Sequence, residues 1–518
     1  MTGLSLDTLL RSRTSQGENR LAVIDPERSY TYGQLAECVG HAAACLRDLG
    51  VAPGDRVVHL GLTGCGHTVF LFAAARLGAL YVPLDSWLMP AALDRLLGRV
   101  EPKVILLGKS LMQRPLAEEL RGSHWRIPDG IEPVDLAAAP WQEVFGASGP
   151  CAPPPSPVAD VSHSPCLMLF SSGTTGEPKG IVFSQESLVL QAMVINLGLG
   201  IGPLERYLNV YQASHYGGIT CSVQTVAAGA CLVNLPLPYP DAILKCIQDR
   251  KITFLVAVPA IWRGVLAHPA APAADFSSLR MANVASDFIP PELMTEIMDR
   301  CGAVSVQGYG LSECGLVTLL PAPEARSRLG SAGIPLPLAA VQTRRPDGPL
   351  AAAGEEGEIW ARTAYAAEGL WTDKKIEPPQ LDAEGFAGTG DLGHLDEAGY
   401  LYVSGRSEDF MKVSGYRVSP AEIEAVLVRH PKVADAAVFP VDHPTLGQAP
   451  VAAIVVGTGG APPAGELAAR VAHELTPQAV PVQFVVAARI ERTEATGKVR
   501  RREMRERFTQ GQYVPLPS

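Results

Sequence analysis

The sequence predicts an α/β protein, in which a large N-terminal domain of layered sheets and helices precedes a small, mobile α+β C-terminal domain. Short apolar runs alternate with segments of helical periodicity along most of the chain. A turn-rich stretch interrupts this alternation near residue 404, and a compact pattern of helices and strand-like runs follows it. We therefore expect one domain of residues 1–407 and a second of residues 408–518, which is long enough to fold separately.

The first clear element is a helix that begins after Thr31. Thr31 and Gln34 have the spacing of a capping box. Apolar residues then recur at helical spacing as far as Leu46, and Gly50 suits the position just past the helix end. A strand is expected at residues 56–62. We interpret these features as core packing.

The C-terminal domain has an equally clear helix start. Ser419 is placed to cap the helix, Pro420 occupies the first helical position, and Glu422 follows three residues after the cap. Two strand-like runs, a second helix and a third apolar run come next. This order predicts a small sheet covered by helices.

Composition excludes several classes of protein. The chain has 518 residues, of which 47% are hydrophobic and 19% charged, so it is expected to be globular. Its net charge of −10 argues against a nucleic-acid partner held through phosphates. No Cys-x-x-Cys pair occurs among the 10 cysteines, which favours a reduced, cytoplasmic setting without zinc. Neither a signal peptide nor a membrane span of about 20 apolar residues is expected.

A glycine-rich segment with one lysine is the most informative part of the chain. An apolar run at residues 166–170 reads as a buried strand and leads into SSGTTGEPKG. Glycine lets backbone N–H groups approach an anion, while small hydroxyls and a lysine add donors and charge. The pattern is not a Walker loop. A flexible surface loop is the alternative, but the preceding strand favours polyphosphate binding. The candidate residues are Ser171, Ser172, Gly173, Thr174, Thr175 and Lys179.

This segment closely resembles the phosphate-binding signature of the AMP-forming adenylating enzymes. That family includes acyl- and aryl-CoA synthetases, adenylation domains of peptide synthetases, and luciferases. The resemblance extends over almost the whole chain and is strongest to the acyl- and aryl-CoA synthetases. It implies the adenylating-enzyme fold, with ATP and Mg²⁺ as cofactors and CoA as a co-substrate.

Two further motifs resemble the family's nucleotide site. The segment QGYGLSE, residues 307–313, resembles a motif that places Tyr309 beside the adenine, Ser312 near the phosphates and Glu313 on the magnesium ion. The resemblance also implies that Asp391 accepts hydrogen bonds from the ribose hydroxyls and that Arg406 contacts the ribose or phosphates. A carboxylate is a suitable acceptor for a diol. Gln307 and Gly308 complete this expected site.

The C-terminal domain resembles the family in three places. Glu408 occupies the hinge between two alternating domain orientations, where Asp or Lys is more usual. Lys412 and Gly415 lie in a motif that enters the active site during the thiol step, with Gly415 beside the pantetheine tunnel. The resemblance makes Lys498 the catalytic lysine of adenylation, because an ammonium group there would counter the charge that develops on the carboxylate and α-phosphate. We interpret five nearby arginines as a solvated surface: Arg500, Arg501, Arg502, Arg505 and Arg507.

The expected acyl pocket indicates a non-amino organic acid. Amino-acid adenylators usually carry an aspartate within the stretch that corresponds to YQASHYGG, residues 211–218, and none is present. His215 either gates the acyl site, as a His or aromatic residue does in CoA synthetases, or is a satisfied, partly buried histidine. Adjacent glycines would leave room for a bulky acid. The expected pocket residues are Ser214, His215, Gly217, Gly218, Ser286 and Gly310.

The sequence thus predicts a ligase that works in two steps. A small-molecule carboxylic acid attacks the α-phosphate of Mg-ATP and pyrophosphate leaves; a thiol then takes the acyl group. CoA is the expected thiol, and a carrier-protein phosphopantetheine acting in trans is an alternative acceptor. The sequence is also compatible with an enzyme that passes its adenylate to a separate thioesterifying protein, with an amino-acid adenylator whose ammonium partner lies elsewhere, and with a non-catalytic nucleotide-binding relative. Composition hints at a bacterial source and secondary-metabolite chemistry.

Overall fold

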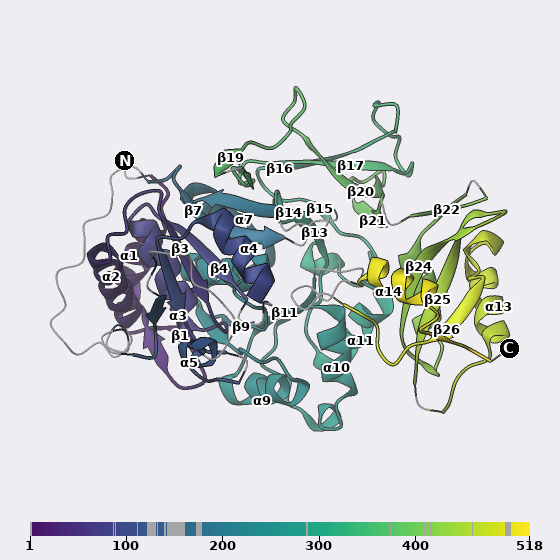
Figure 1. Ribbon diagram of the computed structural model, residues 1–518, viewed down its shortest axis with the longest axis horizontal. Coiled ribbons are helices and arrows are strands. Elements are labelled where there is room, and N and C mark those ends of the chain that lie inside the picture. The colour runs from purple at the N-terminus through teal and green to yellow at the C-terminus, as the bar shows by residue number, and fades with distance from the viewer. Residues whose placement is uncertain are drawn as a thin grey trace.

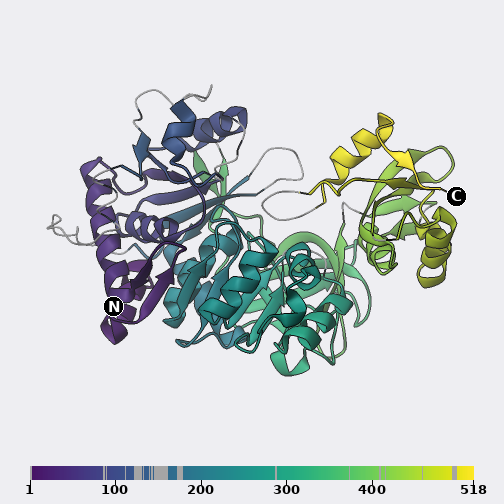
Figure 2. The same ribbon diagram turned by 90° about the horizontal axis from the view of Figure 1, so that it is seen from below.

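The computed structural model describes most of the chain, with gaps. It describes residues 3–85, 88, 90–110, 112–121, 131, 133–138, 141, 144, 161–171, 179–285, 289–372, 374–407, 410–414, 416–457, 459–492 and 499–517. Within these residues, the fold class is the predicted one: a large N-terminal α/β domain and a C-terminal domain (Figure 1). The C-terminal domain lies at one end of the molecule in both views (Figures 1 and 2).

One large sheet of the N-terminal domain has six strands, which are parallel except at one edge. In spatial order they are β12 (Met281–Val284), β11 (Phe254–Ala257), β9 (Arg206–Asn209), β10 (Cys231–Asn234), β1 (Leu21–Ile24) and β2 (Ser29–Thr31). The helices between and around these strands are α7 (Gln185–Leu199), α8 (Tyr216–Ala228), α9 (Pro240–Arg250), α10 (Pro259–Ala267) and α11 (Pro291–Cys301).

A second large sheet has eight strands. They are β19 (Lys375–Glu377), β18 (Gly369–Thr372), β8 (Lys179–Ser184), β7 (Pro165–Ser171), β4 (Leu80–Leu84), β3 (Arg56–Leu60), β5 (Val104–Leu107) and β6 (Pro133–Asp135). Its helices are α1 (Leu6–Gly17), α2 (Tyr32–Asp48), α3 (Cys65–Arg76), α4 (Pro90–Val100) and α5 (Leu116–Arg121). A shared apolar core between the two large sheets includes side chains of α2, α3, α7 and α8, so the two sheets are packed as one unit.

Two smaller sheets follow along the chain. The first contains β13 (Gly308–Leu311), β14 (Gly315–Leu319) and β15 (Ile334–Pro335). The second contains β16 (Ala339–Arg344), β17 (Gly357–Thr363), β20 (Ala387–Leu395) and β21 (Leu401–Arg406). A small apolar cluster that includes Tyr309, Ile359 and Leu401 packs these sheets together. The end of β13 is therefore held close to the β20–β21 pair.

The C-terminal domain has its own sheet and its own core. The strands are β22 (Met411–Val413), β23 (Tyr416–Val418), β24 (Val433–His443), β25 (Gly447–Val456), β26 (Gln483–Val486) and β27 (Val514–Pro515). The helices are α12 (Pro420–Val428), α13 (Ala464–Glu474) and α14 (Arg501–Thr509). Arg429, just after α12, pairs with Glu292 of α11 at 3.3 Å and links this domain to the N-terminal one.

The local signals read from the sequence are confirmed. Thr31 and Gln34 form the capping box of α2, and Gly50 adopts a left-handed φ of 79° just beyond its end. The Ser419 hydroxyl accepts the backbone N–H of Glu422 at the start of α12. Of the helices in the described ranges, none is both long and apolar enough to cross a membrane.

A buried ion pair between α1 and α3 leads to a stability prediction. Arg76 Nη2 lies 2.6 Å from Asp7 Oδ1, and both side chains are less than a tenth exposed. Arg76→Met leaves the buried Asp7 carboxylate with one arginine, the exposed Arg11, whose Nε lies 2.7 Å from Asp7 Oδ2. We therefore expect the free energy of unfolding to fall by about 1.5–3 kcal/mol, the contribution of a hydrogen bond to a charged group. Urea titration measures this loss. Lys245→Ala, which breaks an exposed pair with Asp249, should leave stability unchanged; equal effects of the two substitutions would contradict the prediction.

Two stacked histidines, one on β3 of the eight-stranded sheet and one on the adjacent helix α3, lead to a second prediction. His59 Nδ1 and His67 Nδ1 lie 2.8 Å and 2.7 Å from the Tyr81 hydroxyl. Burial lowers the pKa of His67 to about 4 and holds the pKa of His59 well below its usual range. The folded protein keeps both rings neutral, whereas the unfolded chain binds protons below a pH of about 6.5.

The free energy of unfolding should therefore be unaffected by these histidines above pH 6.5. As the pH drops toward 4, it should fall by about 1.4 kcal/mol per pH unit for each histidine. Urea unfolding between pH 7 and pH 5 measures this slope. His163→Gln alters an exposed histidine and should keep the slope. A pH-independent free energy of unfolding in wild type would show that the histidines are not held neutral.

Candidate active site

A tyrosine, an aspartate and an arginine from three strands meet where the two small sheets adjoin. The Tyr309 hydroxyl of β13 donates to Asp391 Oδ2 of β20 at 2.7 Å. Arg406 of β21 faces Asp391 across the ladder, with its Nε 3.4 Å from Asp391 Oδ1. Burial, followed by the Asp391 charge, raises the pKa of Tyr309 well above its usual range. The phenol is thus a neutral donor that orients the carboxylate.

The backbone around Asp391 explains the Thr-Gly-Asp sequence. The Thr389 hydroxyl donates to the Ile359 carbonyl at 2.7 Å and accepts the Asp391 N–H at 3.1 Å. Gly390 has a φ of 72°, a left-handed conformation that favours glycine. Asp391 is only 7% exposed. Its carboxylate is therefore fixed by the fold, and a carboxylate is a suitable hydrogen-bond acceptor for a diol.

The glycines of the QGYG segment are required by the β13–β14 hairpin. A Cβ on Gly310 would lie 2.2 Å from the Gly315 carbonyl oxygen, and one on Gly308 would lie 2.8 Å from the Thr318 oxygen. Next to them, the buried Oε1 of Gln307 has no hydrogen-bond partner among the described residues. An acceptor in this position, beside Tyr309, is available to a bound ligand.

Ser312 and Glu313 follow at the turn of the same hairpin. Glu313 is exposed, and its backbone carbonyl accepts the Ala367 N–H at 2.8 Å. No group of three or more His, Cys, Asp or Glu side chains gathers as a metal site within the described ranges. One exposed carboxylate fits Mg²⁺, which in nucleotide sites commonly takes one or two carboxylates, phosphate oxygens and water.

The predicted phosphate loop connects two antiparallel strands of the eight-stranded sheet. Ser171 ends β7 and pairs with Lys179, which begins β8 and is exposed. The predicted residues Ser172, Gly173, Thr174 and Thr175 lie outside the described residues. The structure thus fixes both ends of this connection.

His215 is used by the fold as a helix cap. It precedes α8, its Nδ1 accepts the Gly217 N–H at 3.1 Å, and its ring stacks on Tyr211 at 5.1 Å. The hydroxyl of Ser214 hydrogen-bonds to Asp85. The Nδ1 of His215 is thus used as a helix cap. The role of this side chain as a gate of the acyl site stays a prediction.

The two glycines expected in the acyl pocket have different surroundings. A Cβ on Gly218 would lie 1.8 Å from the Gln212 carbonyl oxygen, so the turn itself requires this glycine, and backbone fills the space beside it. A Cβ on Gly217 would make ordinary contacts, at 3.5 Å from His215 Nδ1. A side chain could be accommodated at Gly217 but not at Gly218. The place of both glycines in the acyl pocket stays a prediction. Ser286 lies outside the described residues.

Two buried polar side chains beside the β13–β14 hairpin could not be recognised from the sequence. The Nε2 of Gln191 on α7 and the hydroxyl of Tyr216 on α8 have no hydrogen-bond partner among the described residues. Both lie near Gly315, where an added Cβ would be 1.9 Å from Gln191 Nε2 and 3.4 Å from the Tyr216 hydroxyl. The available signal was a single glutamine inside an otherwise apolar stretch of helix, LVLQAMV.

The predicted C-terminal residues are only partly described. Lys412 is exposed on β22, and its N–H donates to Gln448 Oε1 at 2.8 Å. Glu408, Gly415 and Lys498 lie outside the described residues, so their roles stay predictions.

The fold and the cluster of Tyr309, Asp391 and Arg406 are typical of one class of protein. This class is the nucleotide-dependent adenylating enzymes, which have a large α/β domain and a small C-terminal domain. Comparison with known families agrees. Residues 10–371 match the AMP-binding enzyme family, and residues 422–498 match the AMP-binding enzyme C-terminal domain. The chain belongs to the AMP-binding enzyme family.

Similar curated proteins are ligases of organic acids. The chain is 32% identical over 498 residues to an indoleacetate–CoA ligase of Aromatoleum aromaticum, covering 94% of this chain and 95% of that protein. It is 29% identical to a feruloyl-CoA synthase of a Streptomyces species, covering 96% and 97%.

Among solved structures, the amide bond synthetase McbA of Marinactinospora thermotolerans has a TM-score of 0.83 and 26% identity, covering 97% of this chain and 100% of that one. An anthranilate CoA ligase in complex with anthranoyl-AMP has a TM-score of 0.86 and 24% identity, covering 98% of this chain and 97% of that one. At this identity the similarity shows a shared fold. The chain is thus an AMP-forming acid–thiol ligase.

Proposed function

We propose that this chain joins a non-amino, aryl-substituted carboxylic acid to AMP and transfers the acyl group to CoA. The observation that best supports ATP binding in this proposal is the buried Asp391 carboxylate, which accepts a hydrogen bond from Tyr309 and is flanked by Arg406. The choice of an aryl acid rests on the names of the indoleacetate and feruloyl relatives.

ATP binds across the two small sheets in this proposal. Asp391 accepts hydrogen bonds from the ribose hydroxyls, and the Tyr309 ring lies beside the adenine. Gln307 Oε1, which has no partner among the described residues, is suited to accept a hydrogen bond from the exocyclic amine of the adenine. Arg406 contributes positive charge on the phosphate side of the ribose.

Charge stabilisation carries the first chemical step. Lys179, the loop before it and Ser312 hold the polyphosphate, and Glu313 holds Mg²⁺, which neutralises phosphate charge when bound. In the proposed mechanism, the Lys498 ammonium group counters the charge that develops on the acid and the α-phosphate as pyrophosphate departs. No covalent bond to the protein is needed, so positioning and electrostatics account for the rate.

The second step passes the acyl group to a thiol. Rotation about the hinge at Glu408 brings Lys412 and Gly415 to the site, and the thiol sulfur attacks the acyl carbon while AMP leaves. CoA is the acceptor that the names of the CoA ligase relatives favour. A carrier-protein acceptor has one specific observation in its favour: a fatty acid–acyl-carrier-protein ligase of Streptomyces coeruleorubidus is 28% identical over 499 residues.

Thioester formation across a panel of acids tests the proposal. Purified enzyme is incubated with Mg-ATP, CoA and one acid at a time, including arylacetic, arylacrylic, benzoic, fatty and amino acids. Mass spectrometry should detect AMP and an aryl-CoA with arylacetic or arylacrylic acids first. A preference for amino acids would contradict the acid class. AMP release without any acyl-CoA would indicate that the acyl group is transferred to a carrier protein or by a separate enzyme.

A further inference from the structure

Two buried hydrogen-bond donors lie close together at the β13–β14 hairpin, and neither has a partner among the described residues. They are the Nε2 of Gln191, on α7, and the hydroxyl of Tyr216, the first residue of α8. The point at which Gly315 would carry a Cβ lies 1.9 Å from the first donor and 3.4 Å from the second. The two donors therefore face one small region of the structure.

The surroundings of these donors are apolar. Gln191 is 2% exposed, and Leu188 and Ile195, about one helical turn away on either side, are buried as well. The Phe183 ring packs against the Tyr216 ring, with the ring centroids 5.8 Å apart. A donor without a partner is costly in such surroundings, and native proteins pair nearly all of their buried polar side chains. Two unpaired donors at one place therefore point to a ligand.

The backbone of the hairpin is satisfied without these donors. The Thr363 hydroxyl donates to the Cys314 carbonyl at 2.7 Å, and the Tyr365 hydroxyl donates to the Leu316 carbonyl at 2.8 Å. The carbonyls on both sides of Gly315 are thus paired with other side chains. The two donors consequently have a role other than support of the hairpin.

The donors adjoin both the residues expected to bind the acid and those expected to bind magnesium. Tyr216 stands in the chain between His215 and Gly217, both of which are predicted residues of the acyl pocket. Gly315, the shared neighbour of the donors, follows Glu313 by two residues. Because the donors are buried whereas Glu313 is exposed, they are suited to a buried part of the acid and not to the phosphates.

The chemistry of the donors favours a neutral oxygen as the bound group. An amide nitrogen only donates, and a phenol hydroxyl can donate to the same acceptor. Burial, followed by the neighbouring Tyr365 and Cys314, raises the pKa of Tyr216, so the phenol stays protonated at neutral pH. Neither of these neighbours is cationic, and a buried carboxylate without a cationic partner is strongly disfavoured.

We propose that Gln191 and Tyr216 are specificity-determining residues that bind an oxygen substituent, a hydroxyl or an ether, on the ring of the aryl acid. This inference rests on the proposed function and narrows the class of acid. The substituent supplies the acceptor that both donors lack, whereas an alkyl group in the same place leaves them unpaired. Unpaired polar groups discriminate between substrates more strongly than a change in apolar contact does.

Pairs of acids that differ in one ring substituent test the inference in the purified enzyme. The probes are 3-phenylpropenoic acids with a hydroxyl, methoxy, methyl, ethyl or carboxylate group at each ring position. The readout is kcat/KM for acid-dependent pyrophosphate release from Mg-ATP. We expect wild type to favour the best oxygen-bearing acid over the alkyl acid of similar size by about 10²-fold. Gln191→Met and Tyr216→Phe should each lower this ratio by about 10-fold, with activity toward the alkyl acid retained.

Gln185, on the same helix, provides a matched control. It is fully buried, but its Oε1 accepts the Leu6 N–H at 3.0 Å and its Nε2 donates to the Ala75 carbonyl at 2.9 Å. Gln185→Met breaks both hydrogen bonds, so it should lower the melting temperature without changing the acid preference.

Gln191→Met removes a donor that has no partner among the described residues. Its melting temperature without ligand should therefore equal or exceed that of wild type. The oxygen-bearing acid should raise the melting temperature of wild type more than that of Gln191→Met, because it binds the folded wild-type enzyme more tightly. This binding readout does not depend on catalysis.

Equal kcat/KM of wild type for oxygen-bearing and alkyl acids would overturn the inference and leave the proposed function intact. An unchanged preference in both Gln191→Met and Tyr216→Phe, or a preference for the carboxylate-substituted acids, would overturn it as well. A loss of stability in Gln191→Met as large as that in Gln185→Met would assign the amide a structural role and have the same consequence. Absence of adenylation by wild type with every acid would instead remove the proposed function, and the inference with it.

Discussion

Lys498→Ala is expected to lower the single-turnover rate of adenylation by about 10²- to 10³-fold. The substitution removes the one ammonium group that the proposed mechanism places between the acid and the α-phosphate. Binding of ATP should change much less, because the proposed nucleoside site, with Asp391, Tyr309 and Arg406, belongs to the other domain. Rapid-quench measurement of acyl-AMP, with ATP affinity measured in parallel, separates the two effects.

A second lysine of the C-terminal domain provides the control. Lys412 is exposed on β22, and we assign it to the thiol step. Lys412→Ala should therefore leave acyl-AMP formation near the wild-type rate and slow only the reaction of preformed acyl-adenylate with CoA. Near-normal adenylation by Lys498→Ala would show that another group stabilises the transition state.

Asp391→Asn is expected to weaken ATP binding by about 10- to 100-fold. The substitution removes a charged acceptor from a buried position, and a hydrogen bond to a charged group contributes about 1.5–3 kcal/mol. The asparagine amide also presents donors where the Tyr309 hydroxyl and the ribose hydroxyls need acceptors. Isothermal titration with ATP measures the change.

Asp396→Asn is a matched control in the turn that joins β20 to β21. Asp396 pairs with Arg328 at 2.8 Å and accepts the Tyr400 N–H, so it supports the turn and not the proposed nucleotide site. Its replacement should leave ATP affinity unchanged. Equal affinities of wild type and Asp391→Asn would remove Asp391 from the proposed site.

Local sequence patterns were sufficient to predict several helices and strands, but they could not predict the contacts of the candidate site. The capping box at Thr31 and the cap at Ser419 could be predicted because each depends on residues within one helical turn. Tyr309 and Asp391 are 82 positions apart in sequence and meet through two different sheets. Spacing cannot predict such a contact, and only the resemblance to a known family placed these residues together.

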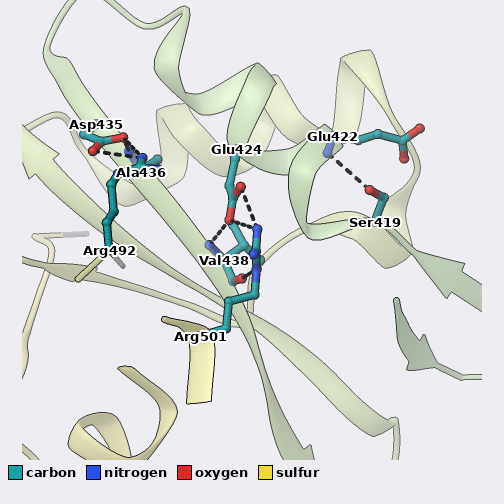
Figure 3. A network of polar contacts seen from close by, with 8 residues as sticks. All are labelled: Ser419, Glu422, Glu424, Asp435, Ala436, Val438, Arg492 and Arg501. Atoms are coloured by element: carbon teal, nitrogen blue, oxygen red, sulfur yellow. Dashed lines mark hydrogen bonds and ion pairs between the residues drawn. The ribbon is translucent and has the colours of Figure 1, made fainter. Parts of the chain in front are cut away.

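The surroundings of several residues could not be predicted from the sequence. Arg501 reads as one charge in a basic run, because Glu424, its partner, is 77 positions away (Figure 3). Gly218 reads as empty space, whereas the fold fills that space with the Gln212 carbonyl. Gln191 and Tyr216 gave no recognisable motif, since their shared neighbour Gly315 comes from a distant hairpin. For Arg501, Gln191 and Tyr216 the neighbours come from distant parts of the chain, whereas for Gly218 the neighbour lies in the same turn.

Exchange of labelled pyrophosphate into ATP tests the central claim most directly, because it requires reversible formation of acyl-AMP and no thiol. The account predicts exchange that depends on both Mg²⁺ and an organic acid, proceeds without CoA, and collapses in Lys498→Ala. Absence of exchange with every acid, while ATP still binds, would contradict it and indicate a non-catalytic nucleotide-binding relative.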